Sequence, residues 1–199
     1  MIAFEDVSIQ LGSFALQDVS FTLPSHQYGV LMGKTGCGKT TILEAICGLK
    51  PVKSGRILLD GRDVTQRSPG SRNIGFVPQD GAIFQTMSVY DNIAFGLSIR
   101  HWQASAIQTR VQELSELLGV AHLLDRRPRH LSGGESQRVA LGRALAANPS
   151  ILCLHEPLSA LDEDTTQEIY EPLQTVKHHT DVTILHITQK NINANEQRE

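Results

Sequence analysis

The feature that most constrains this chain is a glycine-rich stretch, GKTGCGKT, at residues 33–40. It matches the pattern G-x-x-x-x-G-K-[ST] and lies between a short apolar run at 28–32 and a segment with helical composition at 40–47. Glycines let backbone N–H groups close around phosphate oxygens, and the N-terminal end of the following helix attracts negative charge. The pattern predicts a nucleotide phosphate site; the plainer alternative is a glycine turn that caps a helix.

Each residue type in this loop has an expected role. Lys39 can reach the β- and γ-phosphates of a nucleotide, and the Thr40 hydroxyl can bind Mg²⁺. The loop residues expected at the nucleotide are Gly33, Lys34, Thr35, Gly36, Cys37, Gly38, Lys39, Thr40 and Thr41.

Composition narrows the class of protein. The chain has 199 residues, with 18 Lys and Arg against 21 Asp and Glu, and its net charge of −3 gives no electrostatic case for nucleic acid as a partner. Three cysteines without C-x-x-C spacing argue against a disulfide framework and a structural zinc site. No apolar stretch reaches the roughly 18 residues that a membrane span requires. We therefore expect one α/β domain.

Strand and helix signals alternate along the chain, which predicts a mostly parallel sheet covered on both faces. Apolar residues from Trp102 to Leu118 follow helical spacing, so the stretch from about 80 to 130 is expected to be a helical insert. Strands are predicted at 2–9, 14–23, 28–32, 56–59, 74–77, 151–154 and 182–187, and further helices at 40–47, 133–147 and 162–176.

A second glycine motif, LSGGES, opens the helix predicted after this insert. A plain account is a capping box, with Ser132 as N-cap and Glu135 three residues later. Two adjacent glycines, Gly133 and Gly134, nevertheless destabilise a first helical turn by about 1 kcal/mol each relative to alanine. They are explained if a phosphate must approach that backbone closely.

The motifs, in this order, resemble those of the ATP-binding cassette (ABC) ATPases. LSGGESQRVALGRAL resembles their signature motif, GKTGCGKTT their Walker A loop, Gln79 in FVPQD their Q-loop glutamine, and HEPLSALD at 155–162 the end of Walker B with the D-loop. The resemblance implies an α/β P-loop NTPase fold of ABC type, with an N-terminal antiparallel β region. It also implies a catalytic core at 1–79 and 131–199 and a helical subdomain at about 80–130. The further C-terminal strands usual in the family are expected to be missing.

The resemblance also implies function. ABC nucleotide-binding subunits use ATP and Mg²⁺ and dimerise head to tail, so Ser132, Gly133, Gly134 and Glu135 would contact the ATP of a second such subunit. Glu156 would polarise the attacking water, and Gln79 would contact Mg²⁺ and the γ-phosphate. The helical subdomain would dock onto transmembrane permease subunits at the cytoplasmic face of the cell membrane. The tracts MSVYDNIAFGL and PRHLSGGE resemble those of bacterial importers.

Three positions depart from the family pattern. His155 stands where the family has Asp, and Mg²⁺ prefers oxygen ligands to imidazole; the alternative is that Thr40, Gln79, phosphates and water hold the ion. Gln189 stands at the switch histidine and cannot carry a proton. Leu11 replaces the aromatic residue that stacks on adenine; Phe14 could serve instead, or could be a core residue.

The main hypothesis is therefore an ATP-hydrolysing subunit that energises an ABC transporter, an importer by resemblance, with hydrolysis impaired by His155 and Gln189. The alternative is a hydrolysis-deficient ATP-binding switch that contributes its signature motif to a competent partner. Retained Glu156 and Lys39 favour the enzyme, whereas His155 and Gln189 favour the switch.

Overall fold

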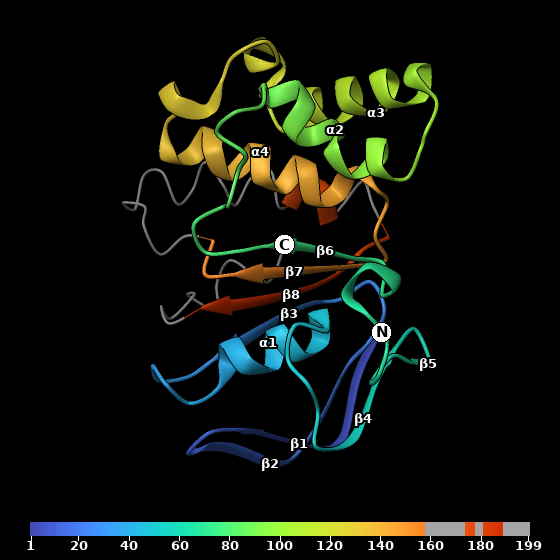
Figure 1. Cartoon of the computed structure of the whole chain (residues 1–199), viewed down its shortest axis with the longest axis vertical. Coiled ribbons are helices and arrows are strands. Elements are labelled where there is room, and N and C mark those ends of the chain that lie inside the picture. The colour runs from blue at the N-terminus through green and yellow to red at the C-terminus, as the bar shows by residue number, and fades with distance from the viewer. Residues whose placement is uncertain (158–173, 178–180, 189–199) are drawn as a thin grey trace.

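The computed structural model describes residues 1–157, 174–177 and 181–188, which form two four-stranded sheets (Figure 1). The first sheet is antiparallel, with the order β2-β1-β4-β5. The second is parallel, with the order β3-β8-β7-β6. The predicted α/β fold with an antiparallel N-terminal region is confirmed. The strands are β1 (Ile2–Leu11), β2 (Phe14–Leu23), β3 (Tyr28–Met32), β4 (Ser54–Leu59), β5 (Arg62–Asp63), β6 (Ile74–Val77), β7 (Ile151–His155) and β8 (Thr183–Thr188).

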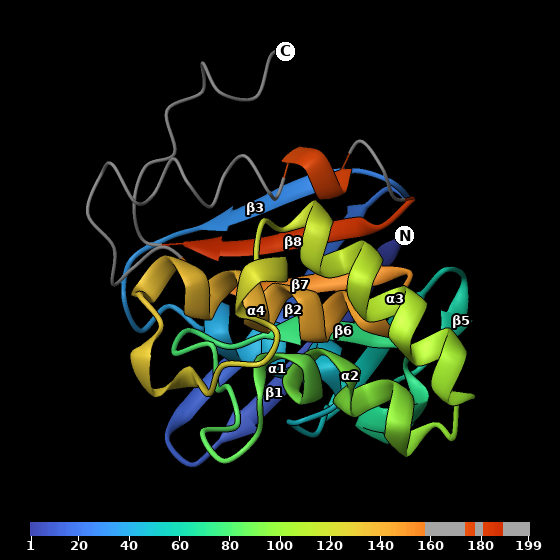
Figure 2. The ribbon, with the colours of Figure 1, turned by 90° about the horizontal axis from the view of Figure 1, so that it is seen from above.

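Helices cover both faces of the parallel sheet. One face carries α4, with α2 and α3 stacked beyond it, whereas α1 lies between the other face and the antiparallel sheet (Figure 1). Seen from above, α2, α3 and α4 lie together on the side of the parallel sheet that faces the viewer (Figure 2). No helix among the described residues is long and apolar enough to cross a bilayer. The helices are α1 (Lys39–Cys47), α2 (Val89–Ile99), α3 (Ala104–Leu117) and α4 (Gly133–Ala146), with 3₁₀ turns at Pro69–Ser71, Ala121–Leu123 and Pro128–His130.

The parallel sheet is buried on both faces, which explains the nearly continuous apolar runs of its strands. Alternate residues of a strand point to opposite faces. Leu152, Leu154 and Ile184 join the apolar cluster beneath α4. Cys153 and Leu185 join the cluster that α1 forms with the antiparallel sheet. The two cores together hold the strand ends in place.

The helix predicted from Trp102 begins later than expected. The Trp102 N–H donates to the Leu97 carbonyl at 3.2 Å, so this residue belongs to the turn that ends α2. Gln103 has an extended backbone (ψ 143°) as the N-cap, and α3 starts at Ala104. Most of the helix predicted at 162–176 lies outside the described residues; its residues 174–176 are helical.

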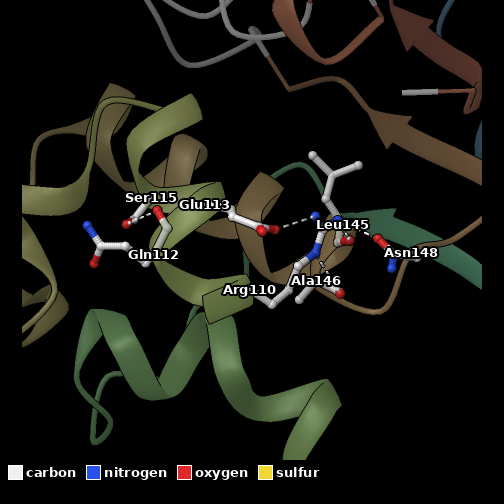
Figure 3. A network of polar contacts seen from close by, with 7 residues as sticks. All are labelled: Arg110, Gln112, Glu113, Ser115, Leu145, Ala146 and Asn148. Atoms are coloured by element: carbon white, nitrogen blue, oxygen red, sulfur yellow. Dashed lines mark hydrogen bonds and ion pairs between the residues drawn. The ribbon is translucent and has the colours of Figure 1, made fainter. Parts of the chain in front are cut away.

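Arg110 of α3 fixes the helical insert to the C-terminal end of α4 (Figure 3). Its guanidinium donates to the carbonyls of Leu145 at 3.2 Å and Ala146 at 3.3 Å, and to Asn148 Oδ1 at 2.5 Å. The last carbonyls of a helix lack partners within the helix. Arg110 supplies such partners, so α3 and α4 are joined by polar contacts as well as by packing.

Candidate nucleotide-binding site

The parallel sheet brings predicted site residues to one edge. β3 leads directly into the glycine loop, β6 ends two residues before Gln79, and β7 ends at His155, which Glu156 follows. Parallel strands present their carboxyl ends at the same edge, where ligands of open α/β sheets bind. Gln189 comes directly after β8 and lies outside the described residues.

A pocket of about 220 Å³ opens at this edge, beside the glycine loop. Every residue that lines it is among those predicted for the site. Gln79 and the residues at the start of α4 are not in this lining. The lining residues are Phe14, Thr35, Gly36, Gly38, Lys39, Thr40, Thr41 and Glu156.

Gly38 shows why the loop needs glycine. It is the N-cap of α1 with a φ of 101°, a left-handed conformation that L side chains rarely adopt. A Cβ atom at this position would lie 2.9 Å from the Phe14 ring and 2.8 Å from a Leu16 methyl group. The start of β2 therefore packs directly on the loop, and it places the half-buried Phe14 ring at the pocket.

Lys39 lies across the inside of the loop. Its ammonium donates to the carbonyl oxygens of Gly33 at 2.7 Å and Lys34 at 3.0 Å, and the residue is only 6% exposed. The side chain is thereby held beside the first turn of α1, whose N-terminal end carries partial positive charge. Lysine and helix end together make this part of the pocket suited to an anion.

Glu156 contributes a carboxylate to the lining of the same pocket. Its backbone has a φ of 45°, which is uncommon for a residue other than glycine and often marks a functional site. The Glu156 N–H donates to the Ile187 carbonyl at 2.9 Å, so the residue is tied to β8 just where β7 ends. It is 8% exposed.

His155 contacts the residue expected to bind Mg²⁺. Its Nε2 atom shares a hydrogen bond with Thr40 Oγ1 at 2.9 Å, although 115 residues separate the two. Thr40 offers an oxygen, but His155 offers a nitrogen where the family pattern has a carboxylate, and Mg²⁺ binds nitrogen poorly. No group of three or more His, Cys, Asp or Glu side chains that could hold a metal occurs in the described residues. Of the two donors, the Thr40 oxygen suits Mg²⁺ and the His155 nitrogen fits it poorly.

At the start of α4, the plain account of the second glycine motif is confirmed. Ser132 Oγ accepts from the Glu135 N–H at 3.1 Å, and Glu135 Oε2 accepts from the Ser132 N–H at 2.7 Å. The backbone hydrogen bond from Ser132 lowers the pKa of Glu135. Gly133 and Gly134 form the first turn, and the four residues contribute nothing to the lining of the pocket described above.

A family profile described as "ABC transporter" matches residues 16–159. The chain belongs to the ABC transporter family. Curated relatives include the molybdate/tungstate import ATP-binding proteins WtpC of Pyrococcus abyssi, 43% identical over 188 residues (94% of this chain, 55% of that protein), and of Archaeoglobus fulgidus, 49% identical over 185 residues (93% and 75%). The sulfate/thiosulfate import ATP-binding protein CysA of Thermosynechococcus vestitus is 45% identical over 188 residues (94% and 56%).

This ABC-family chain spans little more than half the length of most of these relatives. Among solved structures, the ATP-binding cassette MJ0796, a dimer in a post-hydrolysis state bound to ADP and Pi, matches with a TM-score of 0.82. The two are 25% identical, and the match covers 96% of this chain and 88% of that one. The fold is thus that of the ABC-type P-loop ATPases.

Sequence reasoning missed two residues of α4 that hold the loop after β6. Gln137 Nε2 donates to the backbone carbonyl of Gln79 at 3.3 Å. Arg143 donates to the carbonyls of Gly81 at 2.9 Å and Ala82 at 2.8 Å. In the sequence, polar residues on a helix look the same whether they face solvent or a neighbouring loop, so no pattern could have identified these contacts.

Proposed function

We propose that this chain is the ATP-binding subunit of an ABC importer and that the pocket binds the triphosphate of ATP. The observation that carries the proposal is the convergence of Lys39, Thr40 and Glu156 on one pocket, the first two from the start of α1 and the third from the end of β7. An ammonium and a helix N-terminus attract phosphate, and a carboxylate beside them can act on water. The curated relatives described above are all named as import ATP-binding proteins.

In this proposal the glycine loop, Lys39 and Glu156 each have a defined role in binding or hydrolysing ATP. Backbone N–H groups of residues 33–38 surround the phosphates, and the Lys39 ammonium exchanges its carbonyl partners for phosphate oxygens. Glu156 accepts a proton from the water that attacks the γ-phosphate, which leaves ADP and phosphate. The tie between Glu156 and β8 fixes where that carboxylate stands.

Phe14 is proposed to stack on the adenine base. Its ring lies against Gly38 and lines the pocket, whereas Leu11, at the position expected to be aromatic, does not line it. Replacing Phe14 with leucine should weaken binding of ATP more than binding of inorganic triphosphate, because the triphosphate has no base. A stacking contact is worth about 1–3 kcal/mol.

The start of α4 is proposed to serve a second nucleotide-binding subunit. Ser132, Gly133, Gly134 and Glu135 present a helix N-terminus with little side-chain bulk but do not line the chain's own pocket. The ATP-binding cassette MJ0796 forms a dimer. A head-to-tail pair would place this end of α4 against the ATP of the partner, where its dipole favours the γ-phosphate.

Hydrolysis is expected to be slow. His155 supplies no carboxylate beside Thr40, and Gln189 cannot act as a proton-carrying switch residue. Loss of one transition-state contact typically lowers the rate by about 10²–10³. The alternative function, an ATP-binding switch that lends its signature motif to a competent partner, is favoured by the same contact between His155 and Thr40.

The test compares the purified chain with a double variant, His155→Asp with Gln189→His. Steady-state ATP hydrolysis is measured for both, and binding is measured by displacement of a fluorescent nucleotide. We expect the unmodified chain to bind ATP and to hydrolyse it at least about tenfold more slowly than the double variant. Lys39→Ala should lose binding, and Glu156→Gln should bind without hydrolysis. Equal, substantial rates for the first two proteins would refute impairment by His155 and Gln189.

The helical insert is proposed to bind transmembrane permease subunits at the cytoplasmic membrane face. A cleft of about 390 Å³ between α2 and α3 is lined mostly by apolar and aromatic side chains, which suits a short helical segment of such a subunit. The cleft is lined by Met87, Tyr90, Asp91, Ala94, Phe95, Ser98, Ala104 and Ile107.

From the names of the relatives, an oxyanion is the proposed transport substrate.

The proposed permease-binding surface can be tested by co-purification with the permease subunits after Ser98→Asp, which places a charge in the cleft. Ser105→Asp is the matched control, because Ser105 is an exposed serine of the same insert and does not line the cleft. Loss of co-purification for Ser98→Asp alone supports the cleft, whereas equal behaviour of the two variants excludes it.

A further inference from the structure

We infer that the nucleotide pocket prefers a first-row transition-metal cation with affinity for imidazole, such as Co²⁺, Fe²⁺ or Zn²⁺, over Mg²⁺. His155 Nε2 and Thr40 Oγ1 are its two protein ligands. The inference rests on the proposed nucleotide function of the same pocket and names the cation that accompanies the nucleotide there.

The geometry of the two donors matches adjacent corners of one coordination sphere. His155 Nε2 and Thr40 Oγ1 are 2.9 Å apart. Two neighbouring ligands of an octahedral cation with bonds of about 2.1 Å are separated by about 3 Å. One cation can therefore contact both atoms without a change in their separation, and the hydrogen bond between them is replaced by two coordination bonds.

The chemistry of the donors selects the class of cation. A neutral imidazole protonated on Nδ1 presents a lone pair at Nε2. Mg²⁺ demands oxygen ligands and gains little from this nitrogen, whereas the later first-row divalent cations bind imidazole well. With Asp at position 155 the advantage of the imidazole-binding cations would be largely lost, because a carboxylate or its ordered water also suits Mg²⁺.

Binding of this cation should require the nucleotide. Two protein ligands fall short of the usual three or four, so phosphate oxygens and water must complete the coordination sphere. Lys39 and Thr40 line the pocket in which those phosphates would lie. Glu156 lines it too, and its carboxylate adds negative charge that favours a cation.

A purely structural role for His155 predicts a different effect of its replacement on the affinities for cations. If the imidazole only holds the Thr40 hydroxyl by a hydrogen bond, replacing His155 changes stability and affinity for all cations alike. A ligand role predicts a change in the ratio between cations. That ratio is the quantity to measure, because loss of folded protein does not alter it.

The experiment measures the affinity of the full chain for a non-hydrolysable ATP analogue in EDTA, in Mg²⁺ and in Co²⁺. For the unmodified chain we expect Co²⁺ to strengthen binding at least about tenfold more than Mg²⁺ does. For His155→Asp we expect the two cations to agree within about threefold. His155→Ala should lose the Co²⁺ advantage as well, and His130→Ala, at an exposed histidine in the 3₁₀ turn before α4, should keep it.

The absorption spectrum of Co²⁺ gives a second readout. Its d–d bands should shift when the protein is added in the presence of the analogue, and His155→Asp should abolish or change that shift. A Co²⁺-to-Mg²⁺ ratio near one in the unmodified chain, or a ratio unaffected by His155→Asp and His155→Ala, overturns the inference and leaves the ATP-binding proposal intact. Absence of analogue binding in every condition overturns both.

Discussion

His186 is a buried histidine whose protonation should destabilise the fold. It lies in the middle of β8 with no exposed surface, and its Nδ1 atom is 2.7 Å from the Tyr28 hydroxyl. Its Nε2 atom has no hydrogen-bond partner in the described part of the chain. Burial therefore lowers the pKa of His186 from 6.5 to about 4 in the folded state. Acidification should destabilise the protein well before its carboxylates are protonated.

The direction and size of this change in stability with pH follow from proton linkage. Because the folded pKa is depressed, the neutral form stabilises the fold above the unfolded pKa, and this contribution is lost as the pH falls from 6.5 towards 4. A shift of that size corresponds to about 3 kcal/mol in total. Between pH 7 and pH 5 the loss from this one residue is about 2 kcal/mol.

The assay is urea unfolding at about pH 7 and pH 5, for the unmodified chain and for His186→Leu. The leucine variant should lose about 2 kcal/mol less than the unmodified chain over this interval. His130→Leu, at an exposed histidine, is the matched control and should keep the full dependence. Identical pH dependence of the unmodified chain and His186→Leu would show that His186 is not buried in its neutral form.

Three further substitutions test contacts that hold the fold together. Arg72→Met should destabilise the protein by about 3 kcal/mol in urea unfolding, since four backbone carbonyls accept from this buried guanidinium. Arg143→Met should lower stability by about 2 kcal/mol and raise amide hydrogen exchange in the loop at residues 79–84; unchanged exchange there would contradict the contact. Gly55→Ala places a Cβ 2.3 Å from the Asp6 carbonyl, so it should destabilise by about 2 kcal/mol more than Gly61→Ala, which has a similar φ but open space around it. Equal destabilisation by the two glycine variants would mean that the clash is relieved by movement of the backbone.

The parallel sheet and the glycine loop could be predicted because both depend on local patterns. The run ILCL of β7, for example, is apolar on both faces, as a sheet covered on both sides requires. The contact between Thr40 and His155 could not be predicted, because it depends on the strand order β3-β8-β7. In that order only β8 lies between β3, which leads into the glycine loop, and β7, which ends at His155. The strand pattern around Phe14 allows either stacking on adenine or a core role; the structure places its ring at the pocket, and stacking stays a prediction.

The start of α3 shows the limit of periodicity. Trp102 fits the apolar spacing of the helix that follows, but its N–H is already bound to the end of α2. Spacing reports which side chains share a face, and it does not report where the backbone hydrogen bonds change partners. Similarly, the capping box of Ser132 and Glu135 was visible as a local pattern, whereas the phosphate that would explain its two glycines belongs to another subunit in the proposal.

Binding and hydrolysis can separate at this site because the retained and the altered residues act on different steps. Lys39 and the start of α1 attract phosphate whether or not a reaction follows. An aspartate at position 155 would add a negative charge close to Thr40, and at about 4 Å such a charge repels a phosphate oxygen by about 4 kcal/mol at an effective dielectric constant near 20. In the usual site a metal ion offsets that repulsion, so the carboxylate makes binding depend on Mg²⁺. His155 adds no carboxylate, and binding of ATP therefore needs less help from Mg²⁺. The same exchange would hold Mg²⁺ less firmly beside the phosphates on which Glu156 acts. Retention of the nucleotide with slow turnover is thus the expected result of this one exchange.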